Sequence, residues 1–113
     1  MELKQRYIHE DDIPIEVFGN RWGKDLIGTP AIPTTSGFVI GVAEFSSTEF
    51  GELQVHEDQE AIYVLSGHGE YYLDGKTFYV KPGHAIYVPP KTSHSLRSLG
   101  ATPVKVLYAH GAI

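Results

Sequence analysis

The sequence predicts an all-β domain, a sandwich or barrel, on three observations. From Ser36 onward, apolar and aromatic residues come in short bursts separated by turn residues, at the spacing expected of such a fold. No stretch shows a sustained helical period. The 113 residues suffice for one hydrophobic core and are too few for two domains. We therefore expect a single domain over residues 1–113, with its core at about 36–110 and little helix.

Eight bursts rich in β-branched and aromatic residues are predicted to be strands. They cover residues 38–45, 53–56, 60–65, 70–73, 76–80, 85–88, 94–97 and 104–108. Asp74-Gly75 favours a two-residue primed turn, which makes the hairpin around it the firmest local prediction. Residues 25–36, rich in Gly, Pro and Thr, are expected to form a long loop over the barrel mouth.

The N-terminal region mixes strand and turn signals. Residues 7–18 hold apolar residues typical of an edge strand, interrupted by Asp11-Asp12 and Pro14, and we expect two short strands there. Strands within residues 1–22 are expected to lie at a homodimer interface, because a second subunit would cover the exposed edge.

Composition excludes several classes of function. Cysteine is absent, so disulfides, thiolate metal clusters and cysteine nucleophiles are excluded, and any metal must be held by nitrogen and oxygen. The net charge of −5 and the scattered basic residues argue against a nucleic-acid partner. Neither a secretion signal nor a run of eighteen apolar residues is present, so we expect a cytoplasmic protein without a membrane partner.

The chemistry centres on His56, His94 and Glu60. A lone strand histidine is more often a hydrogen-bonded structural residue than a ligand. Here, however, Gln54 and His56 are two residues apart and point to the same face of their predicted strand. Glu60 can turn back toward them if residues 57–59 form a turn, so three or four ligands would converge.

These residues resemble a known family. The spacing His56-x3-Glu60-x6-Gly67, followed by Gly75, Pro82-Gly83, Pro89 or Pro90, and His94, is similar to the two motifs of the cupins and covers about residues 38–108. The resemblance implies a double-stranded β-helix, or jelly-roll, barrel that holds one divalent ion. By the same resemblance His56, Glu60 and His94 would be its ligands, a set that suits Zn, Fe, Mn, Ni or Co and leaves positions open.

The sequence departs from the family pattern at two positions. Gln54 stands where the first histidine of the family is expected, and Ser98 stands where an asparagine often follows the second motif. The amide oxygen of Gln54 could complete a four-ligand site, bind substrate, or merely lie nearby. If His94 is a ligand, its second ring nitrogen should donate a hydrogen bond to a carbonyl, a side chain or water.

Two classes of function follow from such a site. The first is metal-assisted chemistry, of isomerase/lyase or dioxygenase type, on a small oxygen-rich metabolite such as a sugar or keto-enol, with Glu44 and Tyr87 as candidate proton carriers. The second is a non-catalytic cupin that binds or senses a small molecule. A third interpretation is structural, with Glu60 bonded to His56 and no ion.

The other histidines and the tyrosines are expected to have lesser roles. His9, His68, His84 and His110 are predicted to lie at the surface or rim, although His110 could reach a subunit boundary. The tyrosines of the strands are expected to pack in the core or on the sheet faces, with a few hydroxyls directed into a pocket.

Overall fold

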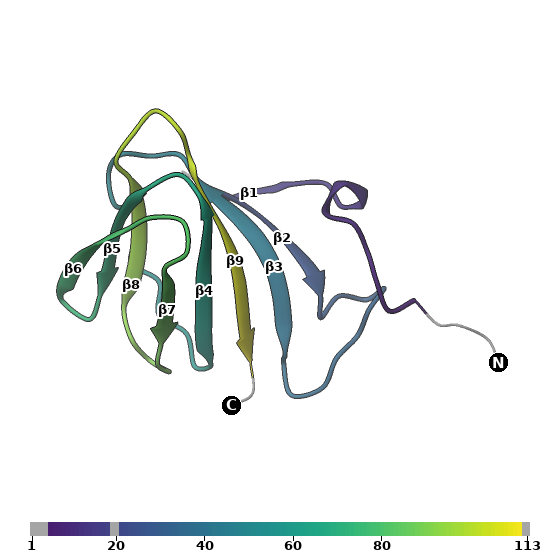
Figure 1. The fold of residues 1–113 in the computed structure, drawn as a ribbon. Coiled ribbons are helices and arrows are strands. Elements are labelled where there is room, and N and C mark those ends of the chain that lie inside the picture. Colours follow the sequence, from purple (N-terminus) through teal and green to yellow (C-terminus); the bar gives the residue numbers. More distant parts are fainter. Residues whose placement is uncertain (1–4, 19–20, 112–113) are drawn as a thin grey trace.

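A computed structural model describes residues 5–18 and 21–111 and shows an all-β fold (Figure 1). Within those residues the helical structure is limited to one 3-10 turn, η1 (Glu10–Asp12). Nine strands are described, namely β1 (Glu16–Phe18), β2 (Arg21–Ile27), β3 (Val39–Phe45), β4 (Gln59–Ser66), β5 (Gly69–Leu73), β6 (Lys76–Val80), β7 (Ala85–Val88), β8 (His94–Ser98) and β9 (Val104–Gly111). In the described part of the chain, no helix has the length and apolar character needed to cross a bilayer.

The strands form two antiparallel sheets that face each other across the core. The larger sheet has the order β1-β2-β3-β9-β4-β7, and the smaller has the order β6-β5-β8. Figure 1 shows the smaller sheet at one end of the molecule, beside β4 and β7, and β1 and β2 at the other end. The non-sequential order places β9 between β3 and β4, and the arrangement confirms the jelly-roll barrel expected from the sequence.

The core lies between the inner faces of the two sheets, and strand alternation puts it there. On β4, Ile62 and Val64 are buried whereas Tyr63 is 46% exposed. Val104 and Val106 of β9 are likewise buried, with at most 1% of each residue exposed. The period of two thus divides each strand into an apolar inner face and a solvated outer face.

The hairpin of β5 and β6 is confirmed at its turn. Asp74 and Gly75 have φ angles of 47° and 86°, the two positive values that a type I′ turn requires. The register pairs Leu73 with Lys76 across the turn and continues to Gly69 and Val80.

Strand β2 corrects the prediction of a loop over residues 25–36. Asp25 and Ile27 pair with β3, so the loop begins only at Gly28. The strand had no apolar alternation to reveal it, because its inward residues include the charged Arg21 and Asp25, which line the cavity beside His56 and Glu60. A strand that faces such a cavity lacks the hydrophobic signal on which the prediction depends.

The predicted strand at residues 53–56 is wrong. Only Gln54 pairs there, in an isolated bridge with His94. Leu53 and Val55 are 42% and 59% exposed, so their side chains point away from the core.

The N-terminal prediction is also partly wrong. Residues 7–18 contain one strand, β1, and the 3-10 turn η1 rather than two strands. The turn is explained by local hydrogen bonds, because the side chain of His9 accepts from Asp11 N and the His9 N–H donates to the Asp12 carboxylate. These side chains satisfy the backbone groups of the turn, in the manner of a capping box. Strand β1 forms one edge of the larger sheet, paired with β2 of its own chain.

Candidate metal centre

The ends of two strands and one loop bring the three predicted ligands together. Glu60 is the second residue of β4, and His94 is the first residue of β8. His56 lies in the loop before β4, and the backbone holds that loop in place. Gln54 and His94 exchange N–H···O bonds of 2.9 and 3.0 Å, and Lys91 N donates to the carbonyl of His56 at 2.8 Å. The loop is therefore held to β8 at Gln54 and to the segment before β8 at His56 itself.

The three side chains converge on one carboxylate oxygen. His56 Nε2 lies 3.1 Å from Glu60 Oε1, and His94 Nε2 lies 3.3 Å from the same atom. Each residue offers one ligand atom, and these atoms lie within 4.8 Å of one another. Glu60 and His94 are 12% and 8% exposed at their side chains, so water screens the cluster poorly.

The second nitrogen of each imidazole fixes which atom faces the cluster. His56 Nδ1 lies 3.0 Å from the carbonyl of Asp58, and His94 Nδ1 lies 2.9 Å from the carbonyl of Thr92. A carbonyl can only accept, so both Nδ1 atoms carry the proton and donate. In neutral imidazoles both Nε2 atoms then present lone pairs toward the carboxylate of Glu60. Two lone pairs and a carboxylate oxygen at one point require a proton or a metal cation between them, and the residues fit a divalent ion.

The close approach of the imidazoles to the carboxylate shifts the pKa values of His56 and Glu60. Burial lowers the pKa of His56, but hydrogen bonds to Glu60 and to the Asp58 carbonyl outweigh that effect and raise it above 6.5. Burial raises the pKa of Glu60, but the hydrogen bonds and charges of His94 and His56 outweigh that effect and lower it below 4.5. Each shift therefore favours the charged form of its group.

His110 and Asp58 extend the cluster in a way the sequence did not predict. The carboxylate of Asp58 lies between two rings, with Oδ1 2.7 Å from His56 Nδ1 and Oδ2 2.8 Å from His110 Nδ1. The His110 ring stacks on Tyr108, at 5.8 Å between centroids. A Cβ atom at Gly41 would collide with the Tyr108 hydroxyl oxygen, so the glycine makes room for this stack. The sequence could have indicated that His110 faces the site, because His110 lies on the same strand face as Val106 and Tyr108. This inference requires the last strand to extend to residue 111.

Two adjoining cavities, of about 350 and 250 Å³, open beside the cluster. Only the larger reaches Tyr71 and Glu52, and only the smaller reaches His56, Tyr108 and His110. Both are lined by Arg21, Phe45, Gln54, Glu60, Ile62 and His94. The volumes suit a small molecule.

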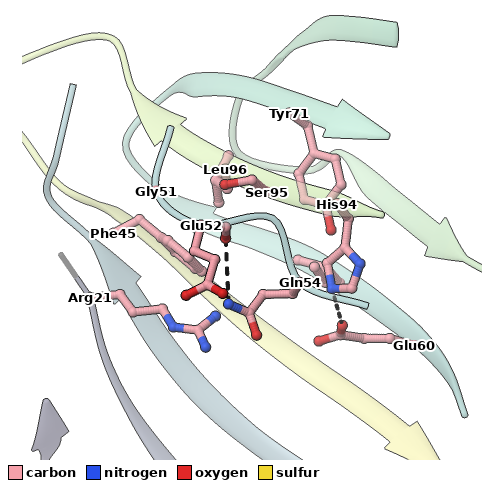
Figure 2. Close-up of a pocket in the computed structure, with 11 residues that line it drawn as sticks. Arg21, Phe45, Gly51, Glu52, Gln54, Glu60, Tyr71, His94, Ser95 and Leu96 are labelled. Atoms are coloured by element: carbon pink, nitrogen blue, oxygen red, sulfur yellow. Dashed lines mark hydrogen bonds and ion pairs between the residues drawn. The ribbon is translucent and has the colours of Figure 1, made fainter. Parts of the chain in front are cut away.

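Gln54 lies inside the barrel, next to the predicted ligands. Its bridge to His94 places both side chains on the same face, and it lines both cavities. Its Nε2 donates to the carbonyl of Glu52 at 3.4 Å. Figure 2 shows its side chain extending into the space between Arg21 and Glu60. The amide is therefore available to a ligand in the cavity.

The two candidate proton carriers are turned away from the cavities. Ala43 and Phe45 line the smaller cavity, so Glu44 between them points to the opposite face of β3. There it accepts a hydrogen bond from Trp22 Nε1 at 3.3 Å. Tyr87 is 56% exposed and lies between two buried neighbours on β7.

The remaining histidines lie at the surface, as expected. His9 caps η1, His84 accepts from Lys81 N at 2.9 Å, and His68 is exposed beside Tyr79. Two imidazoles and a carboxylate can hold a divalent ion with positions left open for water or a substrate atom. The arrangement can therefore support Lewis-acid chemistry or ligand binding in the cavities.

Comparisons with known proteins agree with this architecture. Residues 41–110 match the cupin domain family. A 52-residue segment is 42% identical to the uncharacterized protein MJ1618 of Methanocaldococcus jannaschii, and it covers 46% of this chain and 42% of that protein. The match thus spans less than half the length of that curated relative.

Solved structures show the same fold over nearly the whole chain. The polyketide cyclase RemF from Streptomyces resistomycificus is 25% identical, with a TM-score of 0.80 over 95% of this chain and 79% of that one. A predicted oxalate decarboxylase from Thermotoga maritima is 18% identical, with a TM-score of 0.79 over 96% of this chain and 100% of that one. Since the family match covers more than half of the chain, this protein belongs to the cupin family.

Proposed function

We propose that this cupin is a metal-dependent enzyme of isomerase/lyase or dioxygenase type, acting on a small oxygen-rich molecule. One observation carries the proposal. Two imidazoles whose Nδ1 atoms donate to carbonyls direct their Nε2 atoms at one buried carboxylate, and this leaves a place for a divalent cation. His56, Glu60 and His94 would hold the ion. When bound, it would supply Lewis-acid activation of a ligand oxygen or, as iron, a site for dioxygen.

The protein groups around the cluster support a role in binding and proton transfer. The cavities are large enough for a small metabolite and are lined by both polar and apolar side chains. His110 donates from Nδ1 to Asp58, which leaves its Nε2 atom to accept or give a proton. The likeness to a polyketide cyclase, at 25% identity, supports a small organic substrate.

A second candidate is a cupin that binds a small molecule without converting it. It is favoured by the orientation of Glu44 and Tyr87, since both proton carriers proposed from the sequence lie on outer faces. It shares the metal centre with the first candidate and differs from it only in turnover. Metal-dependent conversion of any sugar, sugar acid or keto-enol in a substrate panel would exclude it.

Metal content tests the centre itself. We expect untagged protein, reconstituted with Mn, Fe, Co, Ni or Zn and then desalted, to retain about one equivalent of at least one metal. Glu60→Gln removes the charge at nearly constant shape and should reduce the content to about a tenth of an equivalent or less. An affinity tag must be absent because it binds the same ions.

Glu44→Gln is the matched control. It makes the same chemical change on an outer face, where the amide oxygen can still accept from Trp22. We expect its metal content to equal that of the wild type. Wild-type protein that retains no metal, or equal losses in the two variants, would contradict the proposed centre.

A further inference from the structure

The strongest unexplained group near the centre is the hydroxyl of Tyr71. Its side chain is 1% exposed, and its Oη atom is buried without a hydrogen-bond partner among the residues that the structure describes. Tyr71 lines the larger cavity. Figure 2 shows its ring above His94, with the hydroxyl directed toward that residue. The hydroxyl is thus aimed into the cavity beside the proposed ligands.

The surrounding sheet holds the ring in this orientation. Tyr71 is in the centre of β5 and pairs with Phe78 of β6 on one side and with Leu96 of β8 on the other. Its ring stacks on Phe78 at 5.8 Å between centroids. A ring held in a closely packed core cannot turn its hydroxyl out to solvent without displacing these neighbours. The position is therefore set by the sheet, and not by a hydrogen bond of the hydroxyl to the protein.

The hydroxyl is a donor rather than an anion. Burial, together with the negative charge of Glu60, raises the pKa of Tyr71 well above its ordinary value. A buried hydroxyl left without a partner costs folding free energy, so a phenylalanine of the same shape would serve the fold at least as well. A ligand oxygen in the cavity would provide the missing partner.

We propose that the Tyr71 hydroxyl donates a hydrogen bond to an oxygen atom of the molecule that binds beside His56, Glu60 and His94. The larger cavity then selects ligands that present an acceptor oxygen at this point, such as carboxylates, ketones or enolates. The inference rests on the proposed metal centre and adds to it a residue of this chain that determines specificity.

Small anions that bind cobalt provide the test. Untagged protein is loaded with Co(II), and its visible absorption bands are titrated with acetate and, separately, with thiocyanate. Acetate offers a second oxygen as acceptor, whereas thiocyanate bound through nitrogen ends in sulfur, a poor acceptor. We expect Tyr71→Phe to weaken acetate binding about tenfold or more and to change thiocyanate binding less than about twofold.

A second readout is independent of the metal. The melting temperature of metal-free Tyr71→Phe should equal or exceed that of the wild type, because the substitution removes an unsatisfied buried group. Tyr63→Phe is the matched control, since Tyr63 is 46% exposed on the neighbouring strand β4. It should leave both anion affinities unchanged.

Three results would overturn the inference, and they are distinguishable. Equal acetate affinity in wild type and Tyr71→Phe would remove the hydrogen bond to the ligand. A lower melting temperature together with unchanged discrimination between the two anions would assign the hydroxyl to the fold. Failure of the wild type to take up cobalt would contradict the metal centre, and this inference with it. If the wild type takes up cobalt and Tyr71→Phe binds acetate as tightly as the wild type, only the role of Tyr71 is contradicted.

Discussion

The two ends of strand β9 share one backbone pattern and differ in chemistry. Toward the start of the strand, the inward residues Val104 and Val106 are completely buried among apolar neighbours. Toward its end, the inward residues Tyr108 and His110 face a cavity and stack on each other. Strand β4 runs antiparallel beside it and repeats the contrast, with Val64 in the core and Glu60 in the site.

The comparison shows how one barrel combines a stable core and a polar site. The ladder of β9 with β3 runs unbroken along both ends, and the ladder with β4 also spans both ends, with one register shift between Val64 and Ser66 at the apolar end. Apolar burial supplies stability at one end, and at the other the same inward positions present ligands. We therefore expect substitutions at the apolar end to change stability without affecting metal affinity. Substitutions at the polar end should change metal affinity without affecting stability.

The largest expected effect on stability is at the apolar end. Val104→Ala should lower the free energy of unfolding by about 2–3 kcal/mol, because it removes two buried methyl groups and leaves a cavity. Metal content should stay at the wild-type level. Urea denaturation of metal-free protein measures the first quantity, and elemental analysis the second. Val17→Ala, at a position 67% exposed, should cost less than about 0.5 kcal/mol.

At the polar end, the carboxylate of Asp58 should affect metal affinity. Asp58→Asn leaves one acceptor oxygen for the two imidazoles that now share the carboxylate, His56 and His110. We expect metal affinity to fall by about ten- to a hundredfold, measured by competition with a chelator. Asp25→Asn is the control, because Asp25 lines the smaller cavity with His56 and His110 but accepts from Tyr108. Equal losses in both variants would show that cavity charge, and not the support of His56, determines the affinity.

The same contrast explains which features the sequence could predict. The β-branched and aromatic residues of segment 60–65 and the Asp-Gly turn are local signals, and both predictions are confirmed. Strand β2 was missed because the polar residues Arg21 and Asp25 face inward. Hydrophobic alternation therefore predicts strands only where the interior is apolar.

The site divides along the same line. Motif spacing was enough to identify His56, Glu60 and His94 as candidate ligands, and the structure places them at one point. Asp58 and His110 are 52 residues apart and meet only through the pairing of β4 with β9. The sequence indicates no such pairing partner, so the support around a ligand is less predictable than the ligand itself.

Lowering the pH should weaken metal binding by competition at His56. Its pKa is raised above 6.5 in the metal-free protein, so a proton must leave before the ion binds. Affinity should be highest above that pKa and should fall about tenfold per pH unit below it, since one proton is displaced. Titrations from pH 8 to pH 6 measure this dependence. Constant affinity over that range would argue against ligation by His56.

The smallest expected effect on stability is on the outer face of β9, where an ion pair lies outside both the core and the site. Lys105 Nζ lies 2.7 Å from Glu10 Oε1, and this hydrogen bond lowers the pKa of Glu10 below 4.5. The pair should therefore stabilise the fold at pH values above 4.5 and lose this effect as the pH falls through the lowered pKa.

Glu10→Gln should accordingly cost less than about 1 kcal/mol at pH 7, because both side chains are partly exposed. The difference from the wild type should shrink at pH 3 and in 1 M salt, measured by urea denaturation. A loss as large as that of Val104→Ala would mean that β9 depends on its outer face as much as on its buried one, and that the contrast between its two ends does not account for its stability.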